Sequence, residues 1–267
     1  MIKNIIIGNY IPVVSIIHKL DPRTKLFISM IFMISLFVAS KYLLALSIIS
    51  VLLLVSISGI SIKKFFKSAK GVSFFIIFSS VLNIFYSQGE VVFRYYFITI
   101  TKLGIENCIF YALRMLNLIF MSSIISFTTL PSDMVYGIEY FLQFLKIFKI
   151  NTQDISLIIS ISLRFIPVIF EETNKIIIAQ KSRGANFEEK NIIKRTKTYL
   201  NILFPMFYSC FKRASDLAVA LESRCYNNSI KHTKLKKFKL KKIDYLFIFL
   251  FILHLILIII ISKIFLK

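Results

Sequence analysis

The sequence predicts an all-α integral membrane protein with about five transmembrane helices and a cytoplasmic domain of long amphipathic helices. Hydrophobic residues occupy 57% of the 267 positions, against roughly 45–50% in ordinary soluble domains, which excludes a soluble globular domain. Several uncharged stretches also approach the roughly 20 apolar residues that cross a bilayer. Basic segments separate these stretches, so the pattern is typical of a multi-pass membrane protein.

Five uncharged stretches are the predicted membrane spans. The first has 15 residues and is flanked by lysines, whose stems can lie along apolar surface. The second has 21 residues and the other three have 18 each, the fourth starting earlier, near Gly104. The five spans are Leu26–Ser40, Tyr42–Ile62, Val72–Gly89, Met115–Ser132 and Tyr245–Ser262.

The basic residues predict the orientation of the chain. Residues 131–242 contain 20 of the 34 basic and 9 of the 13 acidic side chains, and positive loops stay in the cytoplasm. We therefore expect a membrane part with four transmembrane helices over residues 1–130, a cytoplasmic domain over 131–242 and a C-terminal transmembrane helix over 243–267. The N-terminus and the lysine-rich loop over residues 61–70 are expected inside, and a small hairpin or extended flap over Val91–Thr101 is expected outside.

The residues before the first span predict a helix start. Asp21 is suited to cap a helix, and Pro22 to occupy its first position. Arg23 and Lys25 follow at once, and we expect them to anchor the helix at the lipid headgroups.

Three helices are expected in the cytoplasmic domain. Apolar residues at three- and four-residue steps over Pro131–Lys149 predict an amphipathic helix at the membrane interface. A second helix is expected over Ile155–Gly184, kinked at Pro167 and stopped by the glycine. A third is expected from about Glu188 to Arg224, with Pro205 interrupting it.

The two long helices have similar ends. Residues 179–186 and 220–227 align at an offset of 41 and share Ala, Ser, Arg and Asn at the same places. Each end presents one arginine, Arg183 or Arg224, whose planar fork of donors suits carboxylates or backbone carbonyls of a second protein. The repetition predicts two similar docking sites. The simpler interpretation is that each arginine only compensates the helix dipole, worth about 0.3–1 kcal/mol.

Two charged groups within the long helices are expected to be paired. Arg164 lies in an apolar helical run and should pair with Glu171, Glu172 or another acid, because an unpaired charge there would be costly. Arg213 and Asp216 are three positions apart on one helix face and should pair with each other.

Motifs for catalysis or cofactor binding are absent from the sequence. There is no phosphate-binding loop, no dinucleotide-binding fingerprint and no recognisable Ser/His/Asp grouping. We therefore expect no enzymatic activity, no bound cofactor or metal and no ATP hydrolysis by this chain. Seven lysines over residues 231–242 favour attraction to anionic lipid, whereas a nucleic-acid site would have more aromatic side chains among them.

Several motifs, in order along nearly the whole chain, resemble the transmembrane T component of energy-coupling factor transporters, the ABC-type importers of vitamins and transition-metal ions. The segments that carry the resemblance are residues 18–26, 128–133, 163–167, 179–184, 213–218 and 222–226.

The resemblance implies that both helix ends are coupling helices that dock into grooves on two ABC ATPase subunits. The docking residues implied are Ser182, Arg183 and Gly184 in the first helix and Ser223, Arg224 and Cys225 in the second, with Arg164, Arg213, Asp216 and Glu222 as supporting residues. Cys225 departs from the family, which has glycine there. Glycine permits positive φ at a helix C-terminus, so either the second helix ends differently or Cys225 accepts strain of about 1 kcal/mol.

The resemblance also implies a third partner, a small substrate-binding S component in the bacterial cytoplasmic membrane. The chain would be a non-catalytic coupling subunit that transmits ATP-driven motion of the ATPases, which alone use ATP, to the S component for uptake of a vitamin or metal ion. It could serve many S components or one cobalt, nickel or biotin system. The alternative function is a membrane-anchored scaffold whose basic cytoplasmic helices bind anionic lipid or an acidic protein.

Overall fold

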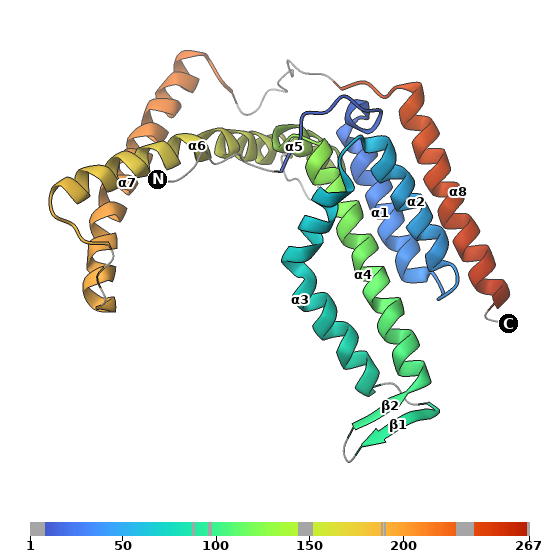
Figure 1. The fold of residues 1–267 in the computed structure, drawn as a ribbon. Helices are drawn as coiled ribbons and strands as arrows, with labels where there is room; N and C mark the ends of the chain where they lie inside the picture. The colour runs from blue at the N-terminus through green and yellow to red at the C-terminus, as the bar shows by residue number, and fades with distance from the viewer. Residues whose placement is uncertain are drawn as a thin grey trace. The chain divides into compact units, whose positions relative to one another are not determined.

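The structure is a computed structural model of the chain and describes residues 9–86, 89–95, 98–143, 152–187, 189, 191–227 and 238–265. The chain forms two compact units (Figure 1). We call Gly8–Phe141 with Phe238–Lys267 the bundle, and Leu142–Lys237 the inserted unit. The units separate at Leu142 rather than at Pro131, because the helix that begins at Pro131 packs onto the bundle.

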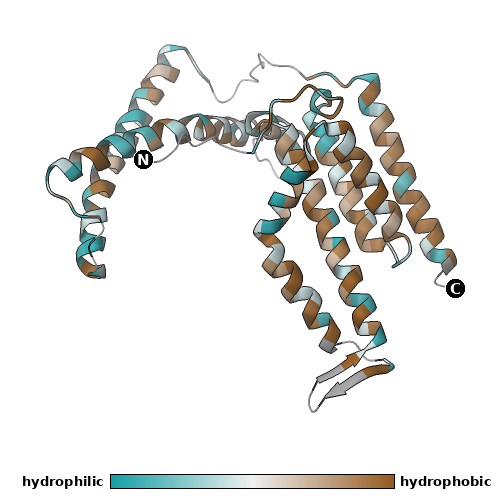
Figure 2. Ribbon diagram, viewed as in Figure 1, coloured by the Kyte–Doolittle hydropathy of each residue, from teal (hydrophilic) through white to brown (hydrophobic). Residues whose placement is uncertain are grey.

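The bundle is built around a long central helix. Its elements are η1 (Ile17–Lys19), α1 (Pro22–Val38), α2 (Leu44–Ser58), α3 (Ile62–Tyr86), α4 (Lys102–Thr128), α5 (Pro131–Leu142) and α8 (Lys242–Phe265). Helix α4 packs against α1, α2 and α3, and α8 packs along α1. Phe32, Leu36 and Phe65 are fully buried in the core between these helices. Apolar residues cover most of the length of the bundle helices (Figure 2), as the composition predicted.

Three described helices are long and apolar enough to cross a membrane: α3, α4 and α8. This confirms the all-α membrane fold. Helix α1 has 17 residues and α2 has 15, and 15 helical residues extend about 22 Å, less than the roughly 30 Å of a hydrocarbon core. The count of five spans therefore stays a prediction.

The turn between α2 and α3 differs from the predicted one. Gly59, with φ 67°, ends α2 at Ser58, four residues before the predicted end of the second span. Helix α3 then begins at Ile62, so the lysines expected in a loop over residues 61–70 lie in its first turns. Lysine is a good helix former whose long stem keeps the ammonium in water, and a lysine-rich segment therefore does not have to be a loop.

The predicted hairpin is present. Strands β1 (Val91–Tyr95) and β2 (Ile98–Thr101) pair antiparallel, with Val91 opposite Thr101, and lie at one end of α3 and α4 (Figure 1). The Thr101 hydroxyl caps α4 by accepting a hydrogen bond from the Gly104 N–H at 3.0 Å. A Cβ on Gly104 would lie 2.7 Å from the Ile84 carbonyl oxygen, so the absence of a side chain here allows α3 and α4 to approach closely.

The inserted unit consists of two long helices packed on each other, α6 (Thr152–Ser182) and α7 (Ile192–Ser223). The Asn191 side chain caps α7 at the Ile193 N–H, which places its start after the predicted Glu188. Helix α7 continues through Pro205, so the predicted interruption is wrong. A proline removes one hydrogen bond of the ladder, and the rest of this 32-residue helix is retained. Part of the interfacial helix predicted over 131–149 lies outside the described residues.

Candidate functional site

Helix α6 ends in a left-handed glycine turn. Gly184 has φ 84°, and its N–H donates to the Lys181 carbonyl at 3.0 Å. The next N–H, that of Ala185, donates to the Gln180 carbonyl at 3.0 Å. These two bonds form the Schellman motif, which satisfies carbonyls at a helix C-terminus.

Helix α7 ends with the same two bonds, shifted by 41 residues. The Cys225 N–H donates to the Glu222 carbonyl at 2.9 Å, and the Tyr226 N–H to the Leu221 carbonyl at 3.0 Å. Cys225 has φ 53°, and among the described residues it alone has positive φ without being glycine. Of the two alternatives for this end, the structure therefore has the strained one, and the motif is kept although cysteine does not favour it.

Both ends present their polar side chains to solvent. Arg183 and Arg224 are exposed, and within the described part of the chain neither forms a salt bridge. Ser182 and Ser223 are also exposed, and their hydroxyls donate back to carbonyls of their own helices. A Cβ on Gly184 would meet nothing within 4 Å. The serine, arginine and left-handed residue at each end thus form an open surface with an exposed guanidinium.

The supporting residues do not pair as the sequence predicted. Arg213 bonds the Glu172 carboxylate of α6 at 2.8 Å rather than Asp216, which is exposed and lines the same surface pocket. Arg164 is exposed, and no described acid forms an ion pair with it, so the expected partner is not found. The reason is that α7 covers only one side of α6. Glu222 contributes its backbone carbonyl to the end of α7.

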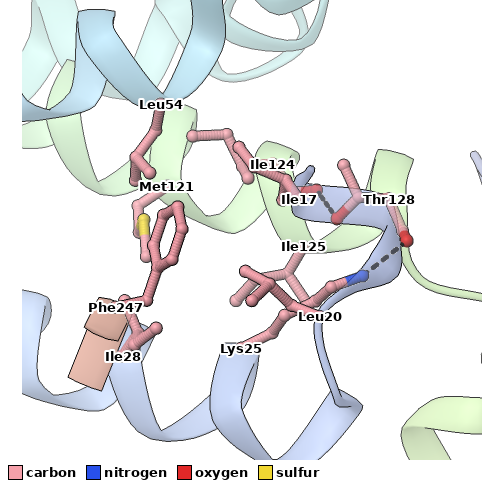
Figure 3. Close-up of a pocket in the computed structure, with 10 residues that line it drawn as sticks. All are labelled: Ile17, Leu20, Lys25, Ile28, Leu54, Met121, Ile124, Ile125, Thr128 and Phe247. Atoms are coloured by element: carbon pink, nitrogen blue, oxygen red, sulfur yellow. Dashed lines mark hydrogen bonds between the residues drawn. The ribbon is translucent and has the colours of Figure 1, made fainter. Parts of the chain in front are cut away.

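A second polar cluster lies in the bundle, where the sequence predicted headgroup anchors. Lys25 is 6% exposed, and its ammonium donates to the Thr128 carbonyl at 2.8 Å and to the Thr129 hydroxyl at 3.2 Å. Its stem lines a small apolar cavity (Figure 3) of about 20 Å³, which has room for one or two water molecules at most. Lys25 therefore links α1 to the end of α4, and the expectation that it anchors in the headgroups is wrong.

Arg23 is enclosed by aromatic rings. Its guanidinium lies 4.6 Å from the Tyr136 ring centroid and 4.9 Å from that of Tyr140. It donates to the Tyr136 hydroxyl and, at 3.0 Å, to the Phe238 carbonyl. The headgroup role expected for Arg23 is thus also replaced by contacts within the chain.

Asp21 has the capping role that the sequence predicted. Its carboxylate accepts from the Arg23 N–H at 2.9 Å at the start of α1, with Pro22 in the first position. Its own N–H donates to the Asp244 carboxylate at 2.9 Å, which also accepts from the Lys241 N–H at 2.7 Å. Asp244, which the sequence did not single out, therefore joins the start of α8 to the start of α1.

Next to this cluster, His18 bonds the Ile11 carbonyl through Nε2 at 3.0 Å and Ser15 through Nδ1 at 2.7 Å. Burial lowers the pKa of His18, with a further lowering from the nearby Lys25 charge.

No group of described His, Cys, Asp or Glu residues could hold a metal ion.

A bundle with three helices that are long and apolar enough to cross a bilayer, interrupted by a two-helix insertion, is the architecture of a membrane component. Residues 13–235 match the CbiQ family, described as cobalt transport protein. The chain is 40% identical over 248 residues, 92% of each chain, to the energy-coupling factor transporter transmembrane protein EcfT of Ruminiclostridium cellulolyticum. It is 37% identical over 264 residues to the EcfT of Lactococcus lactis subsp. cremoris, covering 98% of this chain and 99% of that relative. The chain therefore belongs to this family of energy-coupling factor transporter transmembrane proteins.

Proposed function

We propose that this chain is the non-catalytic coupling subunit of an energy-coupling factor importer in the bacterial cytoplasmic membrane. In this function, the ends of α6 and α7 dock on two cytoplasmic ATPase subunits. Their ATP-driven motion is transmitted to a small substrate-binding S component for uptake of a vitamin or metal ion. The N-terminus and the inserted unit then lie on the cytoplasmic side.

The observation that carries the proposal is the repeated helix end. Compensation of a helix dipole requires only a cation in the last turn, and lysine at several positions would provide it. It does not require the same pair of backbone bonds or a cysteine at φ 53°. Two equal surfaces, each with an exposed arginine fork, are instead suited to two equal partners, since guanidinium bonds to carboxylates or carbonyls are strong and directional.

An apolar stripe on α7 supports a membrane-embedded third partner. Met206, which contacts Thr173, and the buried Ile202 mark the side of α7 that faces α6. The helical spacing of 100° per residue places a run of large exposed side chains on the opposite side. This run consists of Ile193, Leu200, Phe204, Phe207, Tyr208 and Phe211. Contiguous exposed apolar surface of this kind is typical of an interaction site, as expected for contact with an apolar S component.

The proposal is tested by purifying the tagged chain with the products of its neighbouring genes in mild detergent. We expect two ATPase subunits to be recovered with it. In the double variant Arg183→Ala/Arg224→Ala, recovery should fall at least tenfold, which corresponds to about 1.4 kcal/mol. Arg195→Ala removes another exposed arginine, on α7, and should leave recovery unchanged. Phe204→Asp should release the S component while the ATPases remain.

Recovery of the chain alone, or of ATPases that are indifferent to both arginines, would contradict the proposal. The scaffold function would then be favoured. Charge reversal of the lysines over residues 231–242 should in that case abolish binding to vesicles that contain anionic lipid.

A further inference from the structure

The inserted unit is joined to the bundle by two chain connections. One leaves the C-terminal end of α5 at Leu142, and the other returns to the bundle at Phe238, just before α8. A force that passes along the chain between the two units has to pass through these connections. The residues that hold the ends of the two connections in the bundle therefore determine which part of the bundle moves when the inserted unit moves.

Both connections are fixed by one side chain, that of Arg23. It holds α5 through the hydroxyl of Tyr136 and by lying over the rings of Tyr136 and Tyr140. It holds the returning chain through the carbonyl of Phe238 at 3.0 Å. The Tyr136 and Phe238 rings also contact each other, with centroids 4.8 Å apart. The Arg23 side chain is only 18% exposed.

The neighbours of Arg23 fix the adjoining helix ends. Lys25 bonds the last residue of α4, Thr128, just ahead of α5. Asp21 bonds Asp244 in the first turn of α8, just after the returning chain. The segment Asp21–Lys25 at the start of α1 thus contacts the bundle on both sides of the insertion.

We propose that Arg23 is a positioning residue that makes both connections move as one body with α1, so that motion of the inserted unit reaches the bundle through α1. This inference rests on the proposed coupling function. The planar guanidinium suits the role because its donors point in fixed directions while its faces stack on aromatic rings. A lysine carries the same charge without that geometry.

The test measures the distance between the two connections. Spin labels are placed at Ile138→Cys on α5 and Lys239→Cys on the returning chain, both exposed positions, in the full-length chain with its three native cysteines changed to serine. We expect a narrow distance distribution with Arg23 present, at least a twofold wider one for Arg23→Ala, and an intermediate one for Arg23→Lys. The control Arg195→Ala should leave the width unchanged.

The functional consequence is measured in proteoliposomes that contain the whole complex, given radiolabelled biotin, cobalt or nickel in turn. Arg23→Ala should keep the ATPase subunits and their hydrolysis, while uptake per ATP hydrolysed falls at least fivefold. A merely structural role would lower the unfolding temperature and reduce hydrolysis and uptake in the same proportion, and that result would overturn the inference.

An unchanged distance distribution in Arg23→Ala would also overturn it. If Arg23→Ala does not fold, the same distance distribution is measured for Tyr136→Phe, which keeps the ring and removes only the hydroxyl that Arg23 bonds. Partial widening is then expected, and an unchanged width would contradict the inference. If the unmodified chain recovers no ATPase subunits, the proposed function fails, and the spin-label distances still decide whether Arg23 holds the two connections together.

Discussion

The charged residues at the starts of α1 and α8 have hydrogen-bond partners within the chain, whereas the arginines at the ends of α6 and α7 face solvent. Asp21, Lys25 and Asp244 are each less than a tenth exposed and are hydrogen-bonded inside the bundle. Arg183 and Arg224 are exposed and form no salt bridge in the described part of the chain. Burying an unpaired charge is costly, so Asp21, Lys25 and Asp244 need hydrogen-bond partners within the folded chain. The exposed Arg183 and Arg224 can instead bind a second protein. The difference separates residues that hold the fold from residues suited to assembly.

The largest effect on folding is expected for Asp244→Ala. It leaves the buried N–H of Asp21 and the partly buried N–H of Lys241 without their acceptor, which should cost about 3 kcal/mol. The expected result is a clear fall in unfolding temperature in detergent. Asp216→Ala removes an exposed carboxylate and should change stability by less than about 0.5 kcal/mol. Equal unfolding temperatures for the two variants would contradict the contrast between the regions.

Gly184→Ala should destabilise the end of α6. The added Cβ meets no neighbour, but the backbone has φ 84°, a conformation that costs a residue with a Cβ about 1 kcal/mol. Hydrogen exchange of the amides in the last turn of α6 should therefore become about fivefold faster, since 1.4 kcal/mol corresponds to a factor of ten. Exchange in α7 serves as the internal control. An unaffected α6 end would mean that the glycine is not needed for this turn.

Cys225→Gly should stabilise the end of α7, whereas Gly184→Ala destabilises the end of α6. Removing the Cβ relieves the strain at φ 53°, offset in part by the greater freedom of glycine in the unfolded chain. A gain of about 0.5 kcal/mol is expected, seen as slower exchange in the last turn. Cys225→Ser keeps the Cβ and should leave the exchange rate unchanged. Faster exchange in the glycine variant would show that the cysteine side chain itself stabilises this end.

The smallest effect is expected for Glu172→Gln. The carboxylate pairs with Arg213, but the two side chains are 29% and 39% exposed, and such solvent-accessible pairs contribute about 0.2–1 kcal/mol. The unfolding temperature should fall only slightly, and less at high salt, where the pair is screened. Glu171→Gln at the exposed neighbouring position is the control. A large loss would show that the pair governs the packing of α6 on α7.

Local features of the structure could be predicted from the sequence because they depend on neighbouring residues. The helix start at Asp21 and Pro22 and the stop at Gly184 are both confirmed, since capping and positive φ are properties of a few adjacent positions. The hairpin after the third predicted span is confirmed as well. The aligned ends of α6 and α7 could be found by the offset of 41, and the structure adds that their backbone bonds are the same.

Partners distant in the sequence could not be predicted. The sequence offers two acidic partners for Arg213, namely Asp216 on its own helix and Glu172 on α6. The packing of α6 against α7 makes Glu172 the partner. Arg23 lies 113 positions from Tyr136 and 215 from Phe238. Nothing in the local pattern distinguishes an arginine that is stacked between tyrosines from one that reaches the headgroups.

The sequence by itself determined the class of the protein, its family, the start of α1 at Asp21 and Pro22 and the end of α6 at Gly184, because composition, apolar run length and capping residues act locally. Only the tertiary structure decided that Lys25 is buried, that Arg23 lies over the rings of Tyr136 and Tyr140, and that Asp244 joins α8 to α1. It also decided that Cys225 keeps the left-handed turn of Gly184. The physical reason is that burial and hydrogen bonding depend on which helices lie side by side, and that arrangement is fixed by the packing of the whole bundle.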